Sequence, residues 1–222
     1  MADPTYTPPA VWTHDAENGG RFASINRPTA GAREDKVLPA GENPFQLHSL
    51  ATPNGVKATI MLEELLEAGH PAEYDAYTIN IGEGDQFTSG FVAINPNSKI
   101  PALMDHSVTP PRRVFESGAI LIYLAEMAGQ FLPQSSRHRS QCFSWMFFQA
   151  GHTGPMIGQY HHFNSAAPEK IDYAIERYRT ESRRVLGVLD GHLSNNAYLA
   201  GDYTIADMMH YSWARIGLNE LV

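Results

Sequence analysis

Between residues 45 and 79 the spacing of apolar residues changes from that of a strand to that of a helix and back again. Phe45 to Leu50 alternates as a strand does, and Tyr74 to Ile79 is a second candidate strand. The run Val56 to Ala68 between them has an apolar face, with its glutamates turned outward. Two parallel strands joined through one helix form a β-α-β unit, whose crossover is almost always right-handed. We therefore predict a sheet that contains a parallel pair.

A second group of elements follows along the chain. Ala102 to Met104 and Arg113 to Phe115 read as a short hairpin, and a helix runs from Ser117 to about Ala128. Ser117 is the expected N-cap of this helix. Pro101 suits a fixed bend, including a cis one. A β-α-β unit followed by β-β-α is the thioredoxin-like arrangement, so the fold class is α/β in this part.

The strand pattern disappears after Pro133. We expect helices over Arg139 to Gly151 and Pro168 to Leu193, with Pro168 in a first turn. Thr204 to Asp207 has the outline of a capping box, which predicts a further helix. The chain then divides into an N-terminal arm, a thioredoxin-like domain and an all-helical domain, at residues 1–43, 44–131 and 136–222.

Composition excludes several classes of protein. The net charge of −8 lacks the basic surface that nucleic acids require, so we expect no nucleic-acid partner. No apolar stretch is long enough to span a membrane, and the N-terminus has no secretion signal. The single cysteine, Cys142, fits a reducing compartment and is expected to be buried and inert. Cytoplasmic localisation follows as the expectation.

Three polar segments occur where strands meet helices or turns. Thr52 to Gly55 precedes the first helix, where free backbone N–H groups favour an anionic ligand. Asn95 to Pro101 is a turn that runs into a strand, and Glu116 with Ser117 ends another strand. Together they predict a pocket for a small, charged, peptide-like molecule.

These segments, in this order, carry a family resemblance. With Ala174 to Tyr178, the segments Thr52 to Gly55, Asn95 to Leu103 and Phe115 to Leu121 make the chain resemble a glutathione transferase. Within that superfamily it is similar to the nu-class, YghU-type disulfide-bond oxidoreductases from about residue 6 to about residue 207. The resemblance implies an all-α C-terminal domain of the glutathione S-transferase (GST) type.

The end of the chain departs from this pattern. Arg215 to Val222 no longer resembles the family, whose members continue through further helices. We expect a truncated C-terminal domain, with apolar surface exposed on the helix after Thr204.

The reactive sulfur is expected to come from the ligand. A thioredoxin-like protein that uses its own thiol needs a cysteine at the first strand-to-helix turn, and this chain has Thr52 to Gly55 there. The thiol of bound glutathione then has to be ionised, and Thr52 and Asn54 are the candidate catalytic donors. Charge-assisted hydrogen bonds contribute roughly 1.5–3 kcal/mol each. Ordinary N-capping is the alternative role for both residues.

The rest of glutathione suggests partners among the other segments. Glu116 can pair with the α-ammonium group and Ser117 with the adjacent carboxylate. The backbone of Ile100 can bind the cysteinyl part as an added strand would, and Lys99 adds positive charge. The alternative for Glu116 and Ser117 is a strand end followed by a helix cap.

Other candidate ligand contacts come from the resemblance. It implies that Gln86 reaches the glycyl end and that Arg177 and Gln149 contact glutathione from the helical domain. It also implies that Asn26, in the arm, closes over the pocket, and that Pro53 is among the glutathione-binding residues. A mid-helix arginine such as Arg177 is otherwise a solvated surface residue.

We therefore expect a glutathione-dependent disulfide oxidoreductase that uses bound glutathione or glutathione disulfide, with hydroperoxide reduction as a side activity. The resemblance also implies a homodimer, with Trp145 and Phe148 in the contact region. Two alternatives stay open: a conventional transferase that conjugates electrophiles, and a non-catalytic glutathione-binding module. No metal is expected, because the adjacent His161 and His162 point apart and no third ligand has suitable spacing.

Overall fold

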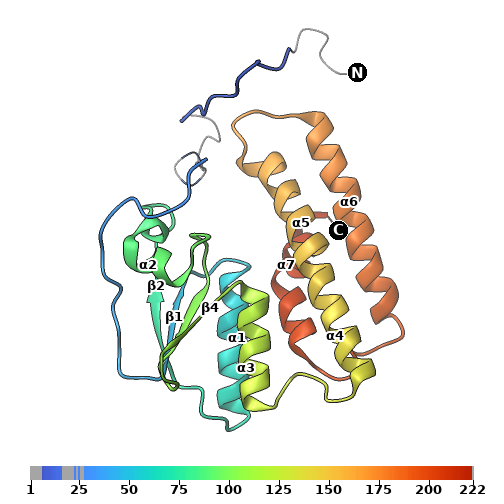
Figure 1. Cartoon of the computed structure of the whole chain (residues 1–222). Coiled ribbons are helices and arrows are strands. Elements are labelled where there is room, and N and C mark those ends of the chain that lie inside the picture. The colour runs from blue at the N-terminus through green and yellow to red at the C-terminus, as the bar shows by residue number, and fades with distance from the viewer. Residues whose placement is uncertain (1–6, 17–22, 24, 26–27, 222) are drawn as a thin grey trace.

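The computed structural model describes residues 7–16, 23, 25 and 28–221. In this part of the chain a mixed four-stranded sheet precedes a group of long helices (Figure 1). The sheet has the order β2-β1-β3-β4. Its strands are β1 (Phe45–Ser49), β2 (Tyr74–Thr78), β3 (Ala102–Asp105) and β4 (Arg112–Phe115). β1 and β2 are parallel, while β1 with β3 and β3 with β4 are antiparallel. The predicted β-α-β unit and hairpin are confirmed.

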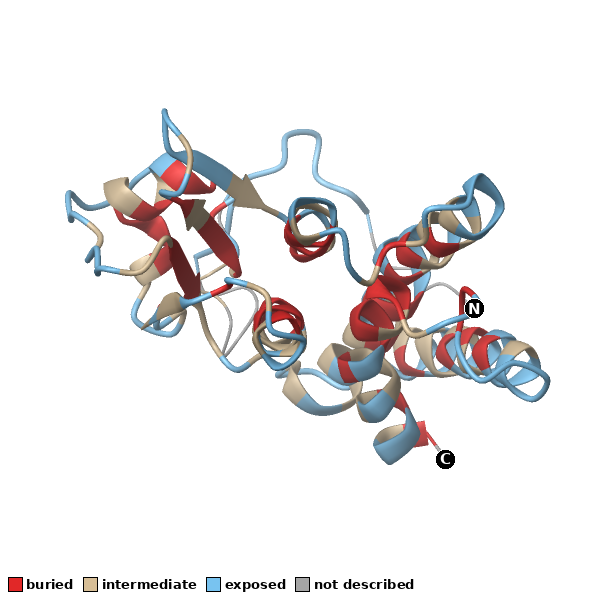
Figure 2. Cartoon of the chain, turned by 90° about the horizontal axis from the view of Figure 1, so that it is seen from below, coloured by how far each residue is buried: buried red, intermediate tan, exposed pale blue. Residues whose placement is uncertain are grey.

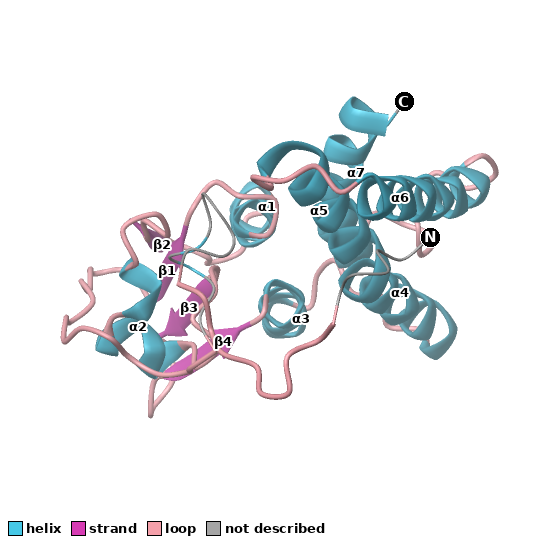
Figure 3. Ribbon diagram, turned by 90° about the horizontal axis from the view of Figure 1, so that it is seen from above, coloured by secondary structure: helices cyan, strands magenta, loops and turns pink. Residues whose placement is uncertain are grey.

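Two helices lie between the sheet and the helical domain (Figure 3). α1 (Gly55–Glu67) and α3 (Ser117–Ala128) bury their apolar residues at helical spacing, including Ala58, Met61 and Leu65 of α1. The other face of the sheet is covered by α2 (Ser89–Ile94). The sequence pattern did not predict α2, because six residues are too few to show a helical period. The 3₁₀ turn Asp85–Phe87 leads into it.

The first helix of the helical domain begins earlier than the predicted Arg139, and the domain contains more elements than the pattern predicted. α4 (Ser136–Phe148) continues through the π-helical turn Gln149–Thr153 into α5 (Gly154–His161). A second π-helical turn, His162–Ala166, ends this long helix. α6 (Asp172–Leu193) starts four residues after Pro168, so the expected first-turn position of Pro168 is wrong. The domain bounds 44–131 and 136–222 stay predictions.

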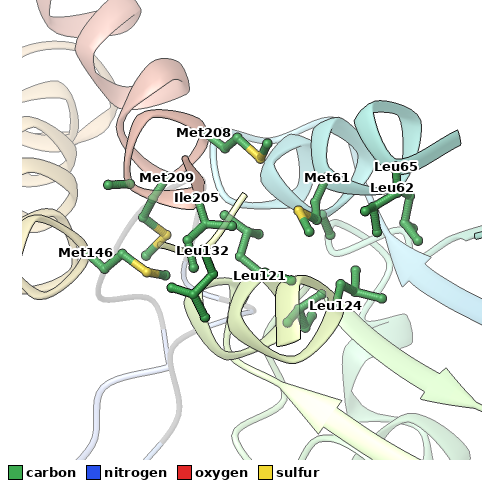
Figure 4. Close-up of a cluster of buried hydrophobic side chains, with 14 of the residues drawn as sticks. Met61, Leu62, Leu65, Leu121, Leu124, Leu132, Met146, Ile205, Met208 and Met209 are labelled. Atoms are coloured by element: carbon green, nitrogen blue, oxygen red, sulfur yellow. The ribbon is translucent and has the colours of Figure 1, made fainter. Parts of the chain in front are cut away.

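α7 (Ile205–Leu221) is the central helix of this domain and joins it to the first one. Figure 4 shows its residues Ile205, Met208 and Met209 facing the apolar side chains of α1 and α3. The predicted capping box is confirmed. The Thr204 hydroxyl accepts the Ala206 N–H at 3.2 Å, and the Asp207 carboxylate accepts the Thr204 N–H at 2.9 Å.

Only one stripe of α7 shows the exposed apolar surface that the sequence led us to expect. Tyr211 and Leu218, seven residues apart, are each 54% exposed, but the opposite face of the helix is buried (Figure 2). Cys142 is fully buried in the core, where burial raises the pKa of its thiol. Across the described residues, every helix is too short or too polar to cross a membrane.

Candidate functional site

A cavity of about 880 Å³ lies between the first domain and helices α4, α5 and α7. This volume is within the range of small-molecule sites, roughly 300–1,000 Å³. Nine of the eleven residues predicted from the sequence line it: Thr52, Pro53, Asn54, Gln86, Lys99, Ile100, Glu116, Ser117 and Gln149.

Of the other two predicted residues, Arg177 is not brought to this cavity. Arg177 lies on α6 in a separate groove, together with Met156, Tyr173 and Tyr178. Asn26 falls outside the described residues, although its neighbour Ile25 lines the cavity.

Thr52 holds the turn at the start of α1. Its hydroxyl oxygen accepts the Gly55 N–H at 3.1 Å, and the Val56 N–H bonds to its carbonyl oxygen at 3.0 Å. The helix-capping role therefore falls to Thr52, and Asn54 occupies the N-cap position without a side-chain capping bond. Because this contact uses an acceptor of the Thr52 hydroxyl, its proton is left to donate.

The orientation of the Asn54 amide is fixed by two donors from different domains. Its Oδ1 accepts from Lys57 Nζ and from Trp213 Nε1, both at 2.9 Å. Since the oxygen is held by these two groups, the NH₂ end is the part of the amide left for a ligand. Thr52 and Asn54 thus both offer donors at a helix N-terminus, which is an arrangement that suits an anion.

Lys57 and Trp213 are site residues that sequence reasoning missed. Lys57 is 1% exposed, and its burial lowers the pKa of its ammonium group to about 7, with the Glu116 carboxylate acting in the opposite direction. Its position one turn before Met61, on the apolar face of α1, was the available signal. Trp213 lies beyond residue 207, where the family resemblance was taken to end.

The loop before β3 is held by Asn95, which is 1% exposed. Its Nδ2 donates to the Lys99 carbonyl oxygen at 2.5 Å, and its Oδ1 accepts the Asn97 N–H at 2.9 Å. The peptide bond between Ile100 and Pro101 is cis, one of the bends that the sequence allowed for Pro101. This loop brings the backbone of Ile100 to the cavity wall.

Glu116 has a backbone conformation that residues other than glycine rarely adopt. Its φ is +70°, and it occupies the N-cap position of α3. Such a conformation costs about 1–3 kcal/mol and is found mainly at ligand sites. Ser117 is the first residue of α3, so the prediction that it is the N-cap is wrong. The strained turn places both side chains at the cavity.

Two buried glutamines of the lining have polar atoms with no partner among the described residues. Gln86 donates to the Ile81 carbonyl oxygen at 3.1 Å, which leaves its Oε1 unpaired. Gln149, in the π-helical turn, has an unpaired Nε2. Buried polar atoms of this kind normally have partners, so each can be satisfied by a ligand. The free atom of Gln86 is an acceptor, which suits a peptide N–H better than a carboxylate.

His210 of α7 connects this region to the core. It shares a hydrogen bond of 2.9 Å with the Trp145 carbonyl oxygen and stacks on Phe148. The pKa of His210 is lowered to about 4, mainly by burial; the hydrogen bond to Trp145 opposes this shift and the nearby Lys57 charge adds to it.

The pKa of His210 leads to a prediction about stability. The unfolded chain binds a proton near pH 6.5, whereas the folded protein binds it only near pH 4, so the free energy of unfolding falls as the pH drops between these values. We expect His210 to contribute a slope of up to about 1.4 kcal/mol per pH unit. Urea titrations at several pH values should show a shallower slope for His210→Gln. The exposed His138, changed to Gln, is the control, and an unchanged slope for His210→Gln would contradict the prediction.

Comparisons with known proteins agree with this geometry. A family model, the glutathione S-transferase N-terminal domain, matches residues 44–126. The chain is 55% identical to the disulfide-bond oxidoreductase YghU of Escherichia coli, over 96% of this chain and 75% of that protein.

Solved structures give the same result over both domains. Glutathione transferase YghU from Streptococcus pneumoniae, complexed with glutathione, has a TM-score of 0.91 and 55% identity, and the match covers 94% of this chain and 80% of that one. A glutathione transferase from Burkholderia graminis, with two glutathione molecules bound per subunit, has a TM-score of 0.73 and 41% identity, covering 79% and 73%. The chain therefore belongs to the glutathione S-transferase superfamily and is similar over nearly its whole length to YghU-type disulfide-bond oxidoreductases.

Proposed function

We propose that this protein reduces small disulfides with glutathione and uses no cysteine of its own. The observation that carries the proposal is the pair of donors at the start of α1, where Thr52 and Asn54 have their acceptor atoms occupied by protein groups. A thiolate accepts hydrogen bonds and donates none, so it matches this pair. Cys142 is fully buried in the core, away from the cavity lining.

The chemistry needs two equivalents of glutathione for each disulfide. The thiolate of the first glutathione attacks one sulfur of the substrate, forms a mixed disulfide and releases the other half as a thiolate, which takes up a proton. The thiolate of a second glutathione attacks the glutathione sulfur of the mixed disulfide. This step forms glutathione disulfide and releases the second substrate thiol. The substrate is reduced and the two glutathiones are oxidised.

The cavity offers distinct walls for the two reactants. Glu116 and Ser117 would bind the γ-glutamyl head of the first glutathione, and the Ile100 backbone its cysteinyl part. The helical wall, with Gln149 among its residues, is left for the second glutathione or the substrate. The Burkholderia relative, with two glutathiones in each subunit, supports this division.

Direct assays test the proposal. Purified protein should release glutathione that mass spectrometry detects, and it should reduce hydroxyethyl disulfide when glutathione reductase recycles the glutathione disulfide. Conjugation of glutathione to a chloronitrobenzene should be much slower. Conjugation as the far faster reaction would favour a conventional transferase, and binding with neither activity would favour a non-catalytic module.

The role of Glu116 can be tested separately from the sulfur chemistry. We expect Glu116→Gln to weaken glutathione binding by about 10- to 100-fold, because a charge-assisted hydrogen bond to the ammonium group is lost. Calorimetry measures the affinity. Glu67→Gln, an exposed change on α1, removes the same charge and should bind normally. Equal affinity in both variants would argue against the ammonium contact.

We also propose that two copies of the chain form a homodimer. Trp145 and Phe148, expected in the contact region, are half-buried and pack against each other and against His210. Phe147 of the same helix, which also lines the cavity, is 73% exposed and adds a further aromatic side chain to this region. The single cysteine and the need for reduced glutathione favour the cytoplasm.

A further inference from the structure

Resting on the proposed function, we infer that Lys57 is a positioning residue for the glutathione sulfur. It holds the Asn54 amide with its NH₂ end toward the thiol, and it places a positive charge beneath the site where the thiolate forms. None of the roles proposed above for Thr52, Glu116 or the glutamines supplies such a charge.

The position of Lys57 supports this role. A lysine side chain is almost never fully buried without a partner of opposite charge. Lys57 is 1% exposed, yet the group that accepts its hydrogen bond is the neutral oxygen of Asn54, at 2.9 Å. It also belongs to the lining of the cavity. A buried ammonium group with a neutral partner, next to a ligand cavity, is suited to an anionic ligand group.

The charged groups around Lys57 leave its positive charge largely uncompensated. Glu116 acts on it from the N-cap of α3, and His210 of α7 is near enough for Lys57 to lower the pKa of the imidazole. Glu116 is an exposed side chain that the proposed function assigns to the ammonium group of glutathione. Once glutathione binds, this carboxylate is paired with the ligand, and the thiolate becomes the new negative charge near Lys57.

Two effects of Lys57 can be separated, because Trp213 shares only one of them. Both residues donate to Asn54 Oδ1, so both orient the amide. Lys57 alone of these two carries a charge. A change at Trp213 should therefore disturb the orientation alone, whereas a change at Lys57 should also remove the positive charge that favours the ionised sulfur.

The experiment titrates the bound thiol by its ultraviolet thiolate absorbance, in the full-length protein with glutathione. In the wild type we expect a thiol pKa clearly below that of free glutathione. Lys57→Met should raise this pKa by about one to three units, the range typical for loss of a neighbouring opposite charge. At saturating glutathione, the lower limb of the pH profile of kcat/KM for the disulfide should move by the same amount, because it then reports the bound thiol. Trp213→Phe should lower kcat/KM but raise the thiol pKa much less than Lys57→Met does, because the positive charge of Lys57 is kept.

The controls keep the two proposals distinct. Lys170→Met removes an exposed lysine outside the cavity and should titrate as the wild type does. If wild-type protein takes up no glutathione in calorimetry, the proposed function fails. If it binds glutathione but the thiol pKa equals that of free glutathione, or is the same in Lys57→Met, the role of Lys57 is overturned. Lys57→Gln replaces Lys57→Met if the latter does not fold. The wild-type titration alone already shows whether the pKa of the bound thiol equals that of free glutathione.

Discussion

Replacing Asn54 by aspartate is expected to lower kcat/KM for disulfide reduction by roughly 100- to 1,000-fold, the cost typical of losing one donor to a reacting anion. The substitution keeps the shape of the side chain but replaces its NH₂ group with an oxygen. One carboxylate oxygen would pair with Lys57 and Trp213, as the amide oxygen does now. The other would face the sulfur, where it repels a thiolate and favours the protonated thiol.

The measurement is the rate of hydroxyethyl disulfide reduction across a range of glutathione concentrations. Most of the loss should appear in kcat, because the contact matters to the ionised sulfur more than to the bound peptide. Asn219→Asp, an exposed change of equal charge on α7, is the matched control and should react normally. An Asn54→Asp variant with unchanged kcat would show that the amide does not donate to the reacting sulfur.

Replacing Gly55 by alanine is expected to destabilise the fold by about 3 kcal/mol, which corresponds to a fall in Tm of roughly 6 to 12 °C for a chain of this size. An added Cβ would lie 1.9 Å from the Leu50 carbonyl oxygen and 2.7 Å from Ser49 Oγ. Because the first of these is a backbone atom, the turn between β1 and α1 has to move. The position of Thr52 and Asn54 would move with it.

A matched substitution separates this steric effect from helix propensity. Gly187, within α6, has no atom within 4 Å of a built Cβ. Gly187→Ala should therefore stabilise the protein by about 0.5–1 kcal/mol, as alanine does in an exposed helix. Thermal unfolding followed by circular dichroism compares the two variants. Equal Tm values would mean that the turn before α1 relaxes at little cost.

Local sequence patterns were sufficient to predict most helices and strands of the first domain. The alternation in β1, the apolar stripe of α1 and the turn between them act within a few residues, so the sequence alone locates them. The same holds for the Thr204 capping box. α2 was missed because it is short. The start of α6 was misplaced because proline is common in the first turn of a helix, whereas Pro168 lies before the first turn of α6.

The candidate site was predictable where its residues lie on strand ends and turns. The apolar face of α1 includes Lys57, but its full burial beside the cavity follows only from how α1 packs against the rest of the molecule. Trp213 reaches Asn54 across 159 positions of sequence, and no local pattern carries such a contact. Arg177 shows the opposite case, since its family pattern is present but α6 places it in another groove. The positions of these three residues depend on packing between distant segments, so no single segment of the sequence predicts them.

The contacts of α7 with the turn before α1 have a consequence for control of the chemistry. Ser212 donates to the Pro53 carbonyl oxygen, and Trp213 donates to Asn54 Oδ1. Consecutive residues of one helix therefore hydrogen-bond to the backbone and to a side chain of the turn. Gly158 of α5 lets the indole lie close, since a Cβ there would come within 3.2 Å of it. A small rotation of α7 about its axis would lengthen both hydrogen bonds together. Binding at the outer surface of the helical domain would then change the pKa of the glutathione thiol without contacting it.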